Sequence, residues 1–152
     1  MLFRSNGGFD GVGYAVPIHV AQHSLNQLLS TGHVLYAWAG ISAEDLTPAI
    51  AKRFGYAAQH GALVDGIALG GPASSAGIRP GHRNVTFLDQ QITVGGDAVT
   101  AVDGIPVTDA NDLARIVAED LRPGEYARFS IARGSRRLEL RVQLGSRSYE
   151  QQ

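Results

Sequence analysis

The chain has 152 residues, of which 44% are hydrophobic and 18% charged, and its formal net charge is −1. These values predict one globular domain of ordinary size with a small appendage, and they exclude a disordered chain. The balanced charge leaves no basic stripe for a phosphate backbone, so we expect no nucleic-acid partner.

The residues that carry chemistry in many proteins are sparse here. The absence of cysteine excludes disulfides, thiolate catalysis and cysteine-bound metals. No apolar run approaches about 18 residues, so no membrane-spanning helix is expected, and residues 1–5 do not open a signal peptide. His19 and His23 have a metal-like spacing but lack a third ligand nearby in the sequence. We expect them to be surface residues, with no metal and no cofactor bound.

The first elements in chain order are a short buried strand at 12–16 and a helix at 17–30. The helix has an apolar side that includes Leu25, Leu28 and Leu29. Such an amphipathic helix requires a partner surface to cover that side.

A strand at 33–43, interrupted at Ala39-Gly40, comes next. Thr47 is a favourable N-cap for a helix at 47–54, and Gly55 ends it. A strand at 62–69 follows.

The segment from Gly66 to Gly81 reads G-I-A-L-G-G-P-A-S-S-A-G-I-R-P-G. Its glycines permit positive φ and its prolines fix φ near the turn value. We expect a strand, then one small-residue helical turn at 72–76 that Gly77 ends.

Two short antiparallel pairings are expected directly after Gly81. Strands at 85–88 and 91–94 form a small hairpin with Asp89-Gln90 at its turn. Strands at 97–102 and 105–107 flank Asp103-Gly104, a strong hairpin turn signal.

The last part of the chain contains an amphipathic helix at 108–121, with Thr108 as its N-cap, and two strands at 125–133 and 136–144. The strands alternate strictly between apolar and polar residues, which is typical of an antiparallel pair with one solvated face. Their apolar positions are Ala127, Phe129, Ile131, Leu138, Leu140, Val142 and Leu144. Together the elements predict a compact α+β unit.

The turn-rich segment Pro72–Gly81 resembles the loop of PDZ domains that usually reads G-S-P-A-x-x-A-G-L-x-x-G-D. This resemblance implies a PDZ-like, partly open antiparallel β-barrel or sandwich of five to six strands with two helices. It also implies peptide recognition by addition of a strand to a sheet edge, without chemistry. The sequence departs from the pattern at Gly81-His82, because the expected Gly-Asp pair appears only later, at Gly96-Asp97. The surface formed by 83–95 is therefore not predicted.

The stretch Trp38–Ile41 resembles the carboxylate-binding loop of bacterial PDZ domains, which often reads aromatic-x-G-aliphatic. The resemblance implies a peptide-binding site made of Trp38, Ala39, Gly40, Ile41, Ser42, Ala43, Leu113, Ile116 and Val117. Each residue also has a purely structural interpretation, with Trp38 as core and Gly40 as a bulge. At least one of Ile116 and Val117 is expected to lie in the core, because a helix cannot turn every apolar residue to one groove.

Upstream, the stretch G-V-G-Y-A-V-P at 11–17 resembles the last strand of the protease domain in HtrA/Deg serine proteases. The resemblance implies a protease-domain tail at 1–32, a PDZ domain at 33–145 and a tail at 146–152. A trypsin-like triad needs a serine nucleophile, which this family carries in G-N-S-G-G, and no G-x-S-G-G occurs in the chain. We therefore expect no catalytic residue here and a serine endopeptidase as the parent protein.

The sequence is compatible with two functions. In the first, the domain recognises C-terminal or exposed apolar segments of client proteins for an HtrA-like endopeptidase, with the parent protease domain as a partner. The resemblance places such a protein in the periplasm or bacterial cell envelope. In the second, the chain is an assembly or gating domain that forms a homo-oligomer through residues 17–31.

Overall fold

The computed structural model describes residues 18–31 and 35–148, so the expected strand at 12–16 lies outside the described residues. The chain divides into two compact units, 1–34 and 35–152. In the first, helix α1 spans Ile18–Thr31, in agreement with the predicted helix. The elements of the second are β1 Leu35–Trp38, β2 Ile41–Leu46, α2 Pro48–Phe54, β3 Gly61–Ile67, α3 Pro72–Ala76, β4 Arg83–Phe87, β5 Gln90–Val94, β6 Ala98–Val102, β7 Ile105–Pro106, α4 Ala110–Arg115, η1 Ile116–Asp120, β8 Tyr126–Arg133, β9 Arg136–Gln143 and β10 Gly145–Ser148. None of the helices within the described ranges has the length and apolar character needed to cross a bilayer.

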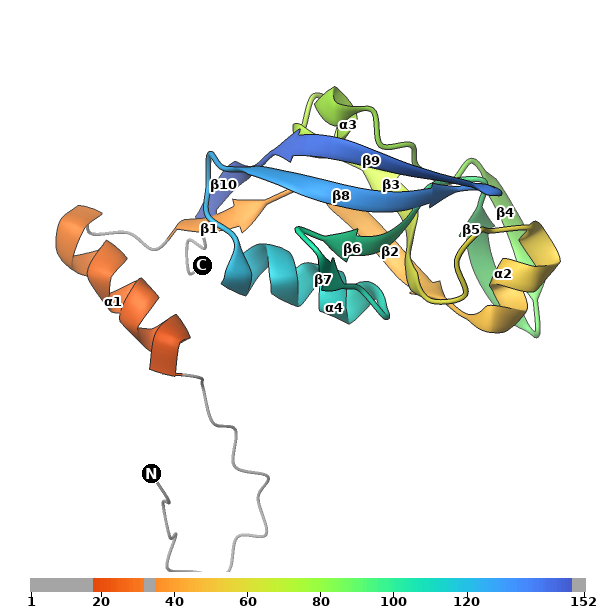
Figure 1. The fold of residues 1–152 in the computed structure, drawn as a ribbon, viewed down its shortest axis with the longest axis horizontal. Helices are drawn as coiled ribbons and strands as arrows, with labels where there is room; N and C mark the ends of the chain where they lie inside the picture. Colours follow the sequence, from red (N-terminus) through yellow and green to blue (C-terminus); the bar gives the residue numbers. More distant parts are fainter. Residues whose placement is uncertain (1–17, 32–34, 149–152) are drawn as a thin grey trace, which may run out of the picture. The chain divides into compact units, whose positions relative to one another are not determined.

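An open antiparallel sheet organises the second unit, with strand order β2-β3-β6-β8-β9 and β7 paired to β6 (Figure 1). The alternation predicted for the last two strands is confirmed on β8, where Ala127, Phe129 and Ile131 are buried. On β9, Val142 is fully buried, whereas Leu138 is only partly covered. The α+β, PDZ-like architecture predicted from the sequence is confirmed.

Local capping signals are reproduced closely. Thr47 has extended backbone angles, and its hydroxyl oxygen accepts a hydrogen bond from the Ile50 amide at 3.3 Å. Gly55 ends α2 and Gly77 ends α3, each in the left-handed region, with φ of 75° and 88°. These positions favour glycine because a Cβ is disfavoured there.

The late helix differs from its prediction at both ends. The N-cap is Asp109 and not Thr108, because the Asp109 carboxylate accepts the Asp112 amide at 2.7 Å. Thr108 instead donates from both its amide and its hydroxyl to the Asp112 carboxylate. The helix also widens into a π-helical turn at Ile116–Asp120, a feature that is frequent at functional sites.

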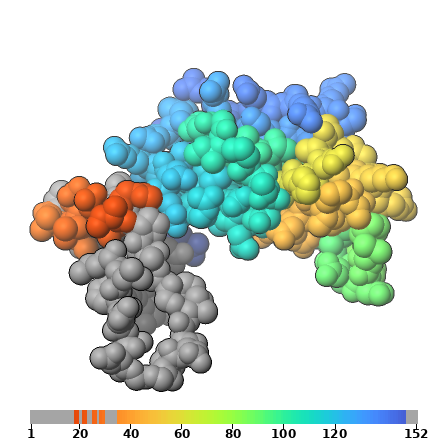
Figure 2. Space-filling view, turned by 60° about the horizontal axis from the view of Figure 1, so that its bottom comes forward, coloured from red at the N-terminus to blue at the C-terminus, as the bar shows by residue number. Residues whose placement is uncertain are grey.

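The hairpin β4–β5 projects from the unit beside α2, and Figure 2 shows it in green as a protrusion. Its turn is Leu88-Asp89 and not Asp89-Gln90 as predicted. Both turn residues have positive φ, 50° and 61°, as a two-residue type I′ turn requires. Beneath the hairpin lies a second small core, whose buried members are Leu46, Ile50, Ala51, Leu63, Ile92, Val94, Ala98 and Ala132.

The two ends of the hairpin lie next to each other, so the chain re-enters the domain where it left it. A Cβ built on Gly96 would lie only 2.4 Å from the Gly81 nitrogen, so the two backbones touch. The next residue, Asp97, is 1% exposed, and its Oδ2 accepts the Arg79 amide at 2.9 Å. The Gly-Asp pair that is split in the sequence is therefore completed in space.

Two strands frame the surface where the predicted site lies. Strand β2 is an outer strand of the main sheet and pairs with β3. Strand β10 was not predicted. It pairs antiparallel with β1, and Trp38 lies opposite Gly145. The β1–β10 ribbon leads directly into the turn at Ala39-Gly40 and so into β2.

Candidate functional site

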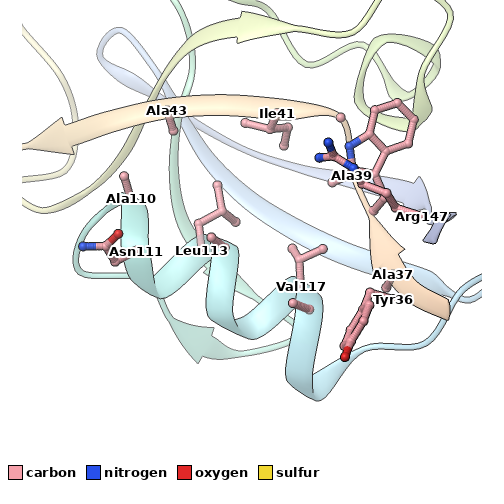
Figure 3. A pocket seen from close by; sticks show the side chains of 14 residues that line it. Tyr36, Ala37, Ala39, Ile41, Ala43, Ala110, Asn111, Leu113, Val117 and Arg147 are labelled. Atoms are coloured by element: carbon pink, nitrogen blue, oxygen red, sulfur yellow. The ribbon is translucent and has the colours of Figure 1, made fainter. Parts of the chain in front are cut away.

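An open cavity of about 370 Å³ lies between β1, the turn that follows it, β2 and the helix α4–η1 (Figure 3). Its volume is in the range of small-ligand and peptide side-chain pockets. The residues that line it are Tyr36, Ala37, Trp38, Ala39, Gly40, Ile41, Ala43, Ala110, Asn111, Leu113, Ala114, Val117, Ala118 and Arg147. Most of these side chains are apolar, so the cavity suits an apolar side chain.

The turn Ala39-Gly40 is held from behind by α3 and by the loop that precedes it. The Ala73 amide donates to the Ala39 carbonyl at 2.9 Å, and the Ala68 amide donates to the Gly40 carbonyl at 2.9 Å. The segment 66–81 thus fixes the turn and is itself not part of the cavity lining.

These two hydrogen bonds also orient the next two amides. A trans peptide unit directs its N–H opposite to its C=O, and the described residues contain no cis peptide bond. Because the Ala39 and Gly40 carbonyls face the α3 loop, the amides of Gly40 and Ile41 point away from it. Both residues line the cavity, so two backbone donors of fixed direction lie at one end of an apolar pocket.

Gly40 is required in this turn by its backbone and by its surroundings. Its φ of +71° lies in the left-handed region, where a side chain is disfavoured. A Cβ would also lie 3.2 Å from the Ala68 Cβ and 3.3 Å from Cζ2 of Trp38. A Gly40→Val change would therefore strain the fold as well as the turn, so it does not isolate binding.

The nine predicted site residues are distributed over the cavity and its surroundings. The cavity is lined by Trp38, Ala39, Gly40, Ile41, Ala43, Leu113 and Val117. Ser42 is exposed and outside the lining, because side chains of a strand alternate between its two faces. Ile116 is fully buried in the core instead, whereas its neighbour Val117 lines the cavity. One of the two is in the core, as the helix argument required.

Sequence reasoning missed several residues that line the cavity. Ala110, Ala114 and Ala118 follow one another at four-residue spacing along the helix and flank Leu113 and Val117. The four-residue spacing of these alanines is visible in the sequence, but alanine side chains by themselves do not indicate a cavity. Two more are Tyr36 and Ala37 on β1.

Arg147 was missed for another reason, because it lies in the part of the sequence that was predicted to be a tail. Pairing of β10 with β1 brings it opposite Tyr36 and into the lining. No motif in the sequence points to this residue.

Comparison with known proteins gives a consistent assignment. The sequence profile of the PDZ domain family matches residues 39–144. A probable periplasmic serine endoprotease, DegP-like, from Rhizobium meliloti (strain 1021) is 33% identical over 95% of this chain and 26% of its own length. A DegP-like relative from Ectopseudomonas mendocina (strain ymp) is 30% identical over 95% of this chain and 27% of its own length. The chain thus spans about a quarter of the curated relatives it matches.

Solved structures agree. The HtrA-type protease AlgW with a decapeptide is 26% identical in sequence to this chain and superposes with a TM-score of 0.66. The match covers 97% of this chain and 40% of the AlgW chain. The HtrA3 PDZ domain bound to a phage-derived ligand (FGRWV) is 19% identical and has a TM-score of 0.56, which supports the fold. That match covers 77% of this chain and 92% of the HtrA3 chain.

The fold, the glycine-dependent turn beside an outer strand and the profile match over most of the chain lead to one assignment: the chain belongs to the PDZ domain family and is homologous to the DegP/HtrA serine endoproteases.

Proposed function

We propose that this chain is the peptide-binding module of an HtrA-like serine endopeptidase and that it captures C-terminal or exposed apolar segments of client proteins. The observation that carries the proposal is the pair of fixed amides at Gly40 and Ile41, at one end of an apolar cavity beside the outer strand β2.

Each part of the site has a role in this proposal. A bound peptide adds a strand beside β2, and backbone hydrogen bonds give affinity without reading side chains. The peptide's last side chain enters the cavity against Leu113 and Val117, which gives specificity for apolar residues. The carboxylate accepts hydrogen bonds from Gly40 and Ile41, and such charge-assisted bonds are stronger than neutral ones.

The relatives support a proposal for the parent protein and its compartment. Solved HtrA-type relatives contain peptides, and curated relatives are named periplasmic serine endoproteases. We infer that the parent protein is a periplasmic serine endopeptidase, that its catalytic triad lies outside this chain and that the division 1–32, 33–145 and 146–152 reflects a protease tail, the PDZ domain and a following segment.

The proposal is tested with fluorescein-labelled hexapeptides ending in Val, Leu or Phe, each as the free acid and as the C-terminal amide. We expect saturable binding in fluorescence anisotropy and at least about tenfold weaker binding of the amides, because charged hydrogen bonds contribute about 1.5–3 kcal/mol. Equal affinity of acid and amide would refute the carboxylate assignment, and binding of none of the peptides would refute the module's proposed role.

A variant that fills the cavity locates the binding. Ala114 lies exposed in the lining, so Ala114→Trp occupies the groove without disturbing the core. Lys52→Trp places the same side chain on an exposed position of α2, outside the cavity. We expect Ala114→Trp to abolish measurable binding and Lys52→Trp to leave it unchanged. Similar effects of both variants would place binding elsewhere.

A second candidate function is assembly or gating through α1. The motivating observation is its exposed apolar side, where Ile18 and Leu29 are 73% and 78% exposed and Leu25 and Leu28 are about half exposed. Exposed apolar surface of this kind favours association. Sedimentation of the chain and of the Leu25→Gln/Leu29→Gln double variant distinguishes the two: a change from oligomer to monomer supports assembly, and a monomer in both cases excludes it.

A further inference from the structure

The carboxylate end of the cavity includes a cation that comes from outside the matched family profile. Among the described residues that line the cavity, Arg147 is the one whose side chain carries a full charge. It belongs to β10, opposite Tyr36 and beyond residue 144, where the profile match ends. Figure 3 shows it at the same end as Ala39, opposite to the end formed by Ala110 and Asn111.

The other charges near this end are unfavourable for a bound anion. The last turn of the helix lines the cavity with Val117 and Ala118, and Figure 3 shows Val117 nearer than Leu113 to the end with Ala39. A helix C-terminus carries partial negative charge. Glu119 and Asp120 add two carboxylates to that turn. The nearby Arg115 pairs with Asp112 at 3.4 Å and approaches Asp120 at 3.8 Å, and it is not part of the cavity lining.

A peptide carboxylate at Gly40 and Ile41 therefore needs more than two neutral amides to offset the helix end. We propose that the Arg147 guanidinium supplies this charge and pairs with the terminal carboxylate of the bound peptide. The inference rests on the proposed function and sharpens it, because an arginine at this point selects free C-termini over internal segments, which have no carboxylate. The segment after the PDZ profile thereby becomes part of the recognition site.

The register of the β1–β10 ribbon explains how this contact is built. Arg147 and Tyr36 are directly opposite, so both side chains lie on one face of the ribbon. Trp38 lies opposite Gly145, two positions nearer to the turn, so its side chain is on that same face. A Cβ built on Gly145 would be 3.5 Å from Cε3 of Trp38, an ordinary van der Waals contact, so the indole packs against the backbone of β10. The guanidinium can thus extend along the ribbon toward the turn at Ala39.

The test uses the full chain and the tightest-binding hexapeptide of the panel described above, as free acid and as amide. Arg147→Gln removes the charge, Arg147→Glu reverses it and Arg147→Lys keeps it. Arg136→Gln is the matched control, because Arg136 is exposed on β9 and lies outside the cavity lining. The thermal midpoint of each variant reports whether it is folded.

For Arg147→Gln we expect about fivefold weaker binding of the free acid, the upper range for a partly exposed ion pair, with the amide unchanged. Arg147→Glu lowers the acid-to-amide preference further, Arg147→Lys restores part of it, and Arg136→Gln has no effect. The wild-type preference also falls with added salt more steeply than that of Arg147→Gln.

Two results would overturn the inference while leaving the proposed function intact. One is a wild-type acid-to-amide preference in folded Arg147→Gln and Arg147→Glu. The other is equal weakening of acid and amide, which would mean that the arginine stem packs on the peptide without pairing with its carboxylate. A wild-type chain that fails to distinguish acid from amide would instead overturn the carboxylate site itself, and the inference with it.

Discussion

The ion pair between the buried Asp97 and the partly exposed Arg133 ties together the segments on either side of the inserted hairpin, and its removal is the sharpest test of that link. Nε of Arg133 donates to Oδ1 of Asp97 and Nη2 donates to Oδ2, both at 2.8 Å. Nη2 also donates to the Gly77 carbonyl at 2.8 Å, and the Arg79 amide donates to Oδ2 at 2.9 Å. The carboxylate raises the pKa of Arg133 above its ordinary value through these hydrogen bonds. The Asp97 carboxylate, just before β6, thus joins this point of the chain to β8 and to the segment after α3.

Asp97→Ala removes three of these hydrogen bonds and leaves a guanidinium and an amide without their acceptor. Breaking a buried ion pair by removal of one partner costs about 3–5 kcal/mol. The Arg133 side chain is 26% exposed and can recover some hydration, so we expect the lower value, about 3 kcal/mol. For a domain of this size, that loss lowers the thermal midpoint by roughly 10 °C.

The assay is urea unfolding followed by Trp38 fluorescence, with Arg133→Ala and the double variant completing a double-mutant cycle. We expect the double variant to lose much less stability than the sum of the single losses, because the second change removes a group that the first left unpaired. Asp120→Ala is the control, since its exposed contact with Arg115 at 3.8 Å contributes less than about 1 kcal/mol. A loss of unfolding free energy below about 1 kcal/mol for Asp97→Ala, or additive losses in the cycle, would refute the claim that the Asp97–Arg133 pair stabilises the fold.

Two further predictions concern pH. Burial raises the pKa of Tyr56 above its ordinary 10.0, so the unfolded chain releases this proton first and stability falls as pH rises past that value. We expect Tyr56→Phe to lose less unfolding free energy than the wild type as the pH rises, measured by urea titrations at a series of pH values. At neutral pH the change costs about 1 kcal/mol, because it removes the hydrogen bonds of the Tyr56 hydroxyl with Gly95 and Gly96. The same dependence of unfolding free energy on alkaline pH in both proteins would contradict this role of Tyr56. The pKa of Asp112 lies below its ordinary 3.8 because the Thr108 side chain and amide donate to it, so its stabilising effect is present above that value and is lost as pH falls. Asp112→Asn therefore loses less of its thermal midpoint on acidification than the wild type, and an equal loss would count against the role of this carboxylate.

Signals that act within a few residues were enough to predict most elements. Thr47 and Gly55 bound a helix through contacts three or four residues away, and the alternation around Phe129 follows from the two-residue period of a strand. The same local rules missed the N-cap by one residue, because both Thr108 and Asp109 are suitable caps and the competing contacts of Asp112 decide between them.

The cavity could be predicted where its lining depends on a motif and not where it depends on distant pairing. Trp38 to Ile41 formed a recognisable turn. The choice between Ile116 and Val117 for the core required the rotation of the helix on the sheet, since neighbouring positions differ by about 100° around a helix axis. The contribution of Arg147 required the pairing of β10 with β1, more than a hundred residues apart in the sequence.

The sequence by itself determined the PDZ architecture, the turn at Gly40 and the late helix that faces it, because glycine conformations, caps and apolar periods are local properties of the chain. Only the tertiary structure decided that Asp97, which completes the interrupted motif in space, pairs with Arg133, and that a strand after the family profile brings a positive charge to one end of the cavity. Both depend on which distant backbones meet, and that is fixed by burial and sheet register over the whole domain.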